Sequence, residues 1–92
     1  MSVTIHVPSV LRRYTGEAAT LERPDAATVG ASLDALARTH PDLYRAICDE
    51  TGTVRRHVNV FVNNTSIRDA DSLATRISPG DVLTIMPAVS GG

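Results

Sequence analysis

The chain has 92 residues, of which 42% are hydrophobic, and its nine basic and ten acidic residues give a formal net charge of −1. This length predicts one small domain, and the balanced charge gives no reason to expect a nucleic-acid or membrane partner. The only cysteine, Cys48, excludes an internal disulfide, and no apolar run is long enough to cross a bilayer. We therefore expect a cytoplasmic protein.

The first part of the chain predicts a pair of strands. Apolar and polar residues alternate over 3–7, which is typical of a strand with one buried face. Residues 14–17 supply a turn, and 18–21 form a weaker second strand, so the pair is interpreted as a hairpin.

A helix is predicted next, over 29 to about 39, with Thr28 as its N-cap. Its apolar spacing places four residues on one face: Val29, Leu33, Leu36 and His40. Pro41 is expected to stop the helix. Residues 43–47 suggest one more short helical turn, and the polar segment 49–56 is predicted to be a loop.

Strict alternation over 57–63 predicts another strand. Val58, Val60 and Val62 form its core face, so Phe61 stands on the opposite face. Residues 66–67 suggest a short edge strand, and 73–77 suggest a single helical turn.

The last apolar run, 82–86, predicts a strand with Leu83 and Ile85 in the core. Met86 then shares the outer face with Phe61. This order of elements predicts an α+β protein in which a mixed sheet of four to five strands packs on one helix. The first and last strands are the most apolar and are expected to be the central pair.

The chain then ends in a tail of small residues. Pro87 ends the strand run, and the sequence closes on Gly91 and Gly92. Without side chains, two glycines can enter a narrow channel, but the terminal carboxylate, with a pKa of about 3.5, must be activated before it reacts as an electrophile. All basic residues are arginine, so no lysine of the chain itself can attack an activated end. The alternative is an ordinary end that stops at glycine by chance.

The order of elements and several stretches, namely 58–63, 73–75, 79–81 and 83–92, resemble the ThiS/MoaD family of ubiquitin-like sulfur carriers. Residues 3–16 are more similar to its CysO branch, which serves cysteine biosynthesis. The resemblance covers the whole chain. It implies a β-grasp domain over 1–87 and a flexible tail over 88–92.

The resemblance also implies a mechanism in which the chain is a carrier and not an enzyme, with no cofactor of its own. An E1-like adenylyltransferase and sulfurtransferase uses ATP and magnesium to adenylate the Gly92 carboxylate, and sulfur then displaces AMP to leave a thiocarboxylate. In the CysO branch, a PLP-dependent cysteine synthase supplies the acceptor, and a zinc metallopeptidase releases the cysteine formed.

Two groups of residues are expected to meet these partners. Phe61 and Met86 form an apolar contact surface beside the tail, unless a loop buries both. The tail that the partner recognises comprises Pro87, Ala88, Val89, Ser90 and Gly91, with Gly92 as the reacting group. Three arginines, Arg55, Arg56 and Arg68, either steer partners or, as we favour, simply lie in solvent.

Other site chemistries lack support. The histidines and Cys48 (His6, His40, His57 and Cys48) show no metal-ligand spacing, so no metal site is expected. Cys48 is interpreted as a half-buried packing residue. Three other hypotheses compete with cysteine biosynthesis. In the first, the chain carries sulfur for molybdopterin, thiamin thiazole or a specialised thio-metabolite. In the second it is a ubiquitin-like modifier of lysines, and in the third it is an interaction module with an inert tail.

Overall fold

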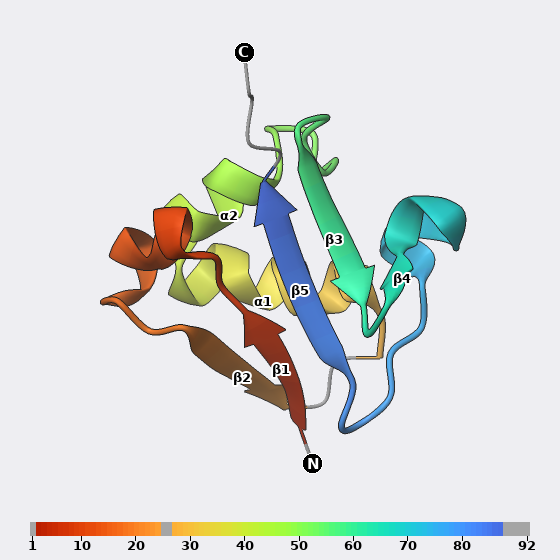
Figure 1. Ribbon diagram of the computed structural model, residues 1–92. Coiled ribbons are helices and arrows are strands. Elements are labelled where there is room, and N and C mark those ends of the chain that lie inside the picture. The colour runs from red at the N-terminus through yellow and green to blue at the C-terminus, as the bar shows by residue number, and fades with distance from the viewer. Residues whose placement is uncertain (1, 25–26, 88–92) are drawn as a thin grey trace.

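The structure, a computed structural model, describes residues 2–24 and 27–87 (Figure 1). The strands are β1 (Ser2–His6), β2 (Thr20–Pro24), β3 (Val58–Val62), β4 (Thr65–Ser66) and β5 (Val82–Pro87). The α-helices are α1 (Val29–Thr39) and α2 (Pro41–Ile47), and the 3-10 helices are η1 (Ser9–Thr15), η2 (Ile67–Asp69) and η3 (Ser72–Ala74). Tail residues 88–92 lie outside the described part of the chain.

The strands form one mixed sheet in the order β2-β1-β5-β3-β4. The first and last strands are parallel neighbours, with Ile5 opposite Leu83, and the remaining pairs are antiparallel. This confirms the predicted mixed sheet and its central pair. The arrangement is a β-grasp, in which the last strand lies between the first strand and β3 (Figure 1).

Both α-helices cover the same face of the sheet, so the prediction of a single covering helix was incomplete (Figure 1). Thr28 caps α1 as predicted, because its Oγ1 accepts a hydrogen bond of 3.1 Å from the Ala31 N–H. α1 ends at Thr39, and His40 lies between the helices as the C-cap of α1. Pro41 then begins α2, since proline fits the first position of a helix, where no backbone donor is needed.

The connection between β1 and β2 also differs from the prediction. In place of a simple turn at 14–17, the chain forms η1 over residues 9–15, and β2 begins at Thr20, two residues later than expected. Leu11 anchors η1 in the core, and the Arg12 Nε donates to the Val7 carbonyl at 3.0 Å. The chain leaves η1 through Gly16, whose φ of 64° is left-handed.

The core lies between the sheet and the helices. Val58, Val60, Leu83 and Ile85 are buried as predicted, whereas Val62, nearer the end of β3, is only half-buried. The remaining buried apolar residues are Val3, Ile5, Val7, Leu11, Val29, Leu33, Leu36, Leu43, Ile47, Cys48, Ile67 and Ile77. No helix in the described ranges is long and apolar enough to span a membrane.

Candidate functional site

The end of β5 fixes the point from which the tail leaves the domain. Pro87 is the last residue of β5 and lies opposite Val58 of β3. It is half-buried, and it is the last residue that the structure describes. The predicted tail residues Ala88, Val89, Ser90, Gly91 and Gly92 lie outside the described residues, so their roles remain predictions. The domain therefore delivers the tail from a strand that is paired on both sides.

The outer face of the sheet carries the predicted apolar pair. In the register of β3 and β5, Asn59 faces Met86 and Phe61 faces Thr84, so Phe61 and Met86 are diagonal neighbours on one face. Met86 is 52% exposed and Phe61 is half-buried, and neither belongs to the buried core. The alternative in which both are buried is therefore wrong for Met86.

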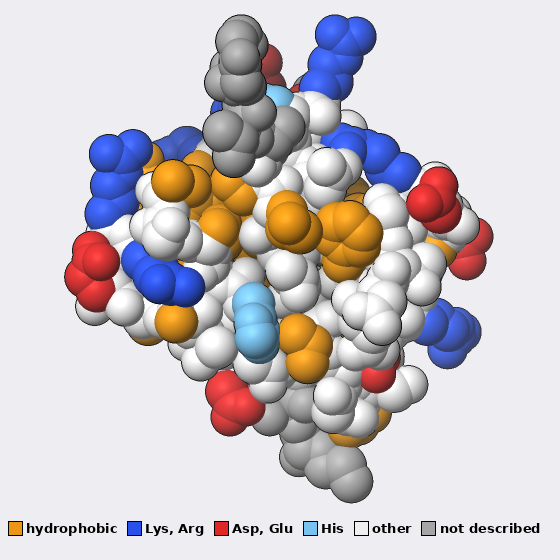
Figure 2. Space-filling view, viewed as in Figure 1, with side chains coloured by type: hydrophobic (Ala, Val, Ile, Leu, Met, Phe, Trp, Pro, Cys, Tyr) orange, Lys and Arg blue, Asp and Glu red, His pale blue; other side chains and the backbone are white. Residues whose placement is uncertain are grey.

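A shallow hollow of about 290 Å³ joins these two side chains. Its remaining lining residues are Asn63, Asn64 and Thr84. Figure 2 shows hydrophobic side chains gathered on this open face, below the end of β5. We call Phe61, Met86 and Thr84 the outer apolar surface. Polar groups of Asn63 and Asn64 thus border an accessible apolar centre, a composition found at many protein interfaces.

Sequence reasoning did not single out Val10, which is the other strongly exposed large hydrophobic residue in the described part, at 62%. Val10 lies on η1 beside the buried Leu11. The neighbouring Arg13 guanidinium sits 5.0 Å from the centre of the Tyr14 ring. Finding Val10 from the sequence would have required recognition of η1, because adjacent residues of a short helix point in different directions.

The arginines near β3 do more than lie in solvent. The Arg68 guanidinium donates to the Arg55 and Arg56 carbonyls at 3.0 and 3.3 Å and to the Asn59 Oδ1. The Arg55 Nε donates to the Arg45 carbonyl at 2.9 Å. Arg55 and Arg68 therefore tie the 49–56 loop to the domain through hydrogen bonds that the prediction of simply solvated side chains did not include. Arg55 is half-buried, whereas Arg56 and Arg68 are exposed to solvent as predicted.

Cys48 is 1% exposed and is therefore fully buried, not half-buried as predicted. Burial raises the pKa of its thiol to about 11, although a hydrogen bond with Tyr44 opposes this rise. At neutral pH the thiol is protonated, and only the thiolate is a good nucleophile. The buried thiol is thus a packing group, and the described residues contain no cluster of three metal-ligating side chains.

Comparison with known proteins places this geometry in context. The ThiS family model matches residues 5–92. The sulfur carrier protein CysO of Mycobacterium tuberculosis is 35% identical over 94 residues, covering 100% of both chains. Small archaeal modifier protein 1 of Haloferax volcanii is 39% identical over 66 residues, covering 72% of this chain and 71% of that protein.

Solved structures agree with the sequence matches. The structure of the Amycolatopsis orientalis BexX/CysO complex contains a chain with a TM-score of 0.88 and 33% identity, with 98% of this chain and 99% of that chain covered. The M. tuberculosis CysO structure gives a TM-score of 0.84 at 34% identity, with coverage of 95% and 99%. The fold is shared with both, over nearly the whole of each chain.

Proposed function

Since the chain belongs to the ThiS family of ubiquitin-like sulfur carriers, we propose that its Gly92 carries sulfur as a thiocarboxylate for the biosynthesis of cysteine. The observation that carries this proposal is the match to CysO, a named sulfur carrier, over the whole of both chains. The two proteins align through the C-terminal Gly91-Gly92, where the chemistry would take place. Residues 1–87 would be the folded handle, and 88–92 the reacting tail.

The proposed charging reaction has two steps, both performed by an E1-like partner. A Gly92 carboxylate oxygen attacks the α-phosphorus of magnesium-bound ATP, and pyrophosphate leaves. The sulfur of a sulfide equivalent then attacks the acyl carbon, and AMP leaves, so a C–S bond replaces the acyl C–O bond without net oxidation. The thiocarboxylate sulfur would next add to an aminoacrylate that a PLP-dependent cysteine synthase makes from an activated serine. An S-to-N acyl shift would then leave cysteine in amide linkage to Gly92, and a zinc metallopeptidase would hydrolyse that amide to release the cysteine.

In this proposal the chain contributes position and accessibility instead of catalysis. Pro87, held against Val58, fixes the origin of the tail, and the outer apolar surface lies beside it on the same two strands. A partner that docks on Phe61 and Met86 would thereby find the tail at a set distance. Fixing the geometry in advance lowers the entropic cost of bringing the acyl end to an active site.

The decisive experiment is intact mass spectrometry after incubation with the cognate E1-like enzyme, ATP, magnesium and sulfide. We expect a species heavier by the exchange of one oxygen for sulfur, with the difference localised to the C-terminal peptide. Removing Gly92 should abolish this species while leaving the melting temperature unchanged. A complete reaction mixture that yields only the carboxylate would contradict the proposal.

A second candidate function is modification of other proteins, which the similarity to small archaeal modifier protein 1 favours. The acyl end would then form an amide with a lysine of a target. The chain has no lysine, so it could not build lysine-linked polymers of itself. Thiol-resistant adducts of higher mass in the host, lost when Gly92 is removed, would support this function; their absence would favour sulfur transfer alone.

A further inference from the structure

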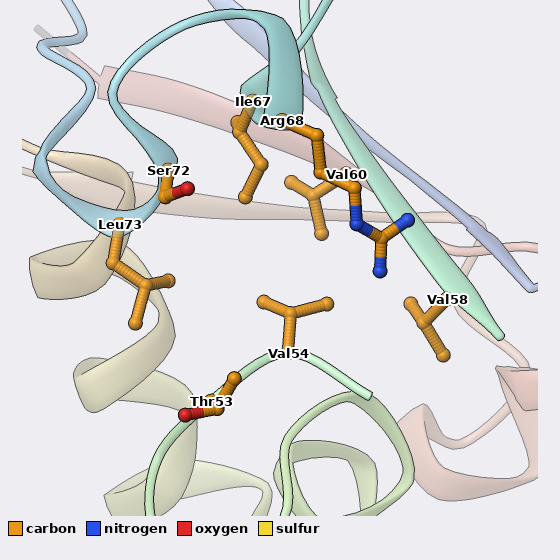
Figure 3. Close-up of a pocket in the computed structure, with 8 residues that line it drawn as sticks. All are labelled: Thr53, Val54, Val58, Val60, Ile67, Arg68, Ser72 and Leu73. Atoms are coloured by element: carbon orange, nitrogen blue, oxygen red, sulfur yellow. The ribbon is translucent and has the colours of Figure 1, made fainter. Parts of the chain in front are cut away.

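A separate cavity, of about 280 Å³, opens on the helix side of β3, facing away from the outer apolar surface. The inward side chains of Val58 and Val60 form one wall. The remaining lining residues are Thr53, Val54, Ile67, Arg68, Ser72 and Leu73 (Figure 3). The lining is mainly apolar, but one end carries a guanidinium group. A volume near the lower end of the range of roughly 300–1,000 Å³ for ligand sites suits a small molecule.

Hydrogen bonds hold the guanidinium of Arg68 at this end of the cavity, at its solvent-exposed side. Figure 3 shows it beside Val58 and Val60, with Ser72 and Leu73 across the cavity. Its Nη2 donates to the Arg55 and Arg56 carbonyls, and its Nη1 donates to Asn59 Oδ1. A guanidinium has five N–H donors, so Nε and one hydrogen of Nη1 are left for a further acceptor.

The acceptors that hold Arg68 are all neutral. In residues 2–24 and 27–87, the ion pair that the structure contains joins Arg45 and Asp42, not Arg68. Within the described residues, the positive charge at the cavity therefore has no carboxylate in an ion pair with it. Because arginine binds carboxylates in a forked geometry, the chemical complement of this end is a carboxylate.

The other walls of the cavity are built by specific local features. Gly30 of α1 allows η3 to approach closely: a Cβ at Gly30 would lie 3.1 Å from the Leu73 carbonyl oxygen. Ser72 adopts a left-handed φ of 53°, an unusual conformation for a residue other than glycine. On the facing wall, Asp49 Oδ1 accepts hydrogen bonds from the Thr51 and Thr53 N–H groups at 2.9 and 3.2 Å, which shapes the loop that carries Val54.

From these features we propose that the cavity binds a small aliphatic monocarboxylate. The aliphatic part lies among Val54, Ile67 and Leu73, and the carboxylate accepts hydrogen bonds from Arg68. The cavity lies on the covered side of β3, whereas Phe61 and Met86 lie on the outer face, so a ligand can occupy it while the outer apolar surface stays accessible. This inference does not depend on the proposed sulfur chemistry, and its test does not involve Gly92.

The test compares two probes that differ only in charge: 4-methylpentanoate and 4-methylpentanamide. Each is titrated into ¹⁵N-labelled full-length protein at pH 7, and amide shifts are followed by two-dimensional NMR. We expect saturable shifts at Val54, Ile67 and Leu73, with the carboxylate binding about tenfold more tightly than the amide. Equal binding of the two probes, or shifts confined to Phe61 and Met86, would overturn the proposal.

Variants then test which residues cause the preference for the carboxylate over the amide. Arg68→Gln should remove the tenfold preference for the carboxylate, whereas Arg56→Gln, a neighbouring arginine that does not line the cavity, should keep it. Val54→Phe should fill the cavity and weaken both probes while leaving Arg68 in place. If Arg68→Gln loses its native NMR dispersion, the paired probes on the wild-type chain and Val54→Phe still decide the outcome. Unchanged binding in Val54→Phe would contradict the site.

Discussion

The two faces of the sheet differ in solvent exposure, although the same strands form both. On β5, Leu83 and Ile85 point toward the helices and are 0% and 1% exposed, whereas Met86 on the opposite face is 52% exposed. Successive side chains of β5 thus point alternately into the core and toward the surface. The comparison teaches that stability should depend on the covered face, and partner binding on the open one.

The largest expected effect tests the covered face. Ile85→Ala should reduce the free energy of unfolding by about 2–5 kcal/mol, because it leaves a cavity in the core between sheet and helices. Thr84→Ala, at the next position on the open face, should change stability by less than about 1 kcal/mol. Urea denaturation of both variants measures their free energies of unfolding. Similar losses in the two variants would contradict the difference proposed between the two faces.

The next effect tests the open face. Met86→Ala should weaken binding to the cognate E1-like enzyme by about 1–2 kcal/mol, because an exposed apolar anchor is lost, with little change in melting temperature. Isothermal titration calorimetry measures the affinity. Thr20→Ala, on the exposed edge strand β2, is the matched control and should bind normally. Unchanged binding of Met86→Ala together with a large loss of stability would reverse the assignment.

A smaller effect concerns the helix that covers the inner face. Thr28→Ala should cost about 1 kcal/mol of unfolding free energy, because the Ala31 N–H loses the oxygen that caps it. Thr28→Ser keeps that oxygen and should retain most of the stability. Thermal denaturation of the two variants checks this, and equal losses would show that the methyl group matters more than the cap.

The last effect is a pH dependence of stability, and it originates in the buried thiol of Cys48 beneath the covered face. Burial raises the pKa of Cys48 from 9.0 to about 11, so the unfolded chain loses this proton at lower pH than the folded chain does. The contribution to stability is therefore complete below about pH 9 and is lost as pH rises toward 11.

Chemical denaturation at pH 8 and at pH 10.5 measures this loss for the wild-type chain and for Cys48→Ala. Tyr44, whose pKa burial and the neighbouring Cys48 both raise, is present in both proteins, so the difference between them reports the thiol together with its coupling to Tyr44. We expect the wild type to lose more stability than the variant over this interval. Identical slopes would show that the thiol ionises alike in both states.

Regular alternation made much of the fold predictable from the sequence. The valines of β3 and the core residues of β5 follow the two-residue period of a strand, and Thr28 is a residue type that caps helices. Residues 9–15 do not alternate, and only Leu11 and Tyr14, three residues apart, pack on the core, so the pattern is too short to predict a 3-10 helix. The position of β2 was misjudged for the same reason, since it depends on how η1 ends.

Contacts between distant parts of the chain were beyond prediction. From the sequence, Arg68 is predicted to be a solvated loop residue. Only the fold shows that it donates hydrogen bonds to the Arg55 and Arg56 carbonyls. The burial of Cys48 likewise depends on how α2 packs. The outer apolar surface was predictable because it needed only the alternation of β3 and β5, whereas the cavity at Arg68 required four separate segments to meet.

The central place of β5 has a mechanical consequence. A partner that grips the C-terminal end pulls along a strand laddered to β1 on one side and to β3 on the other. Such a load shears two rows of hydrogen bonds at once instead of peeling an edge strand open one bond at a time. A load at this end of β5 would therefore have to break both rows before the strand unravels from the domain.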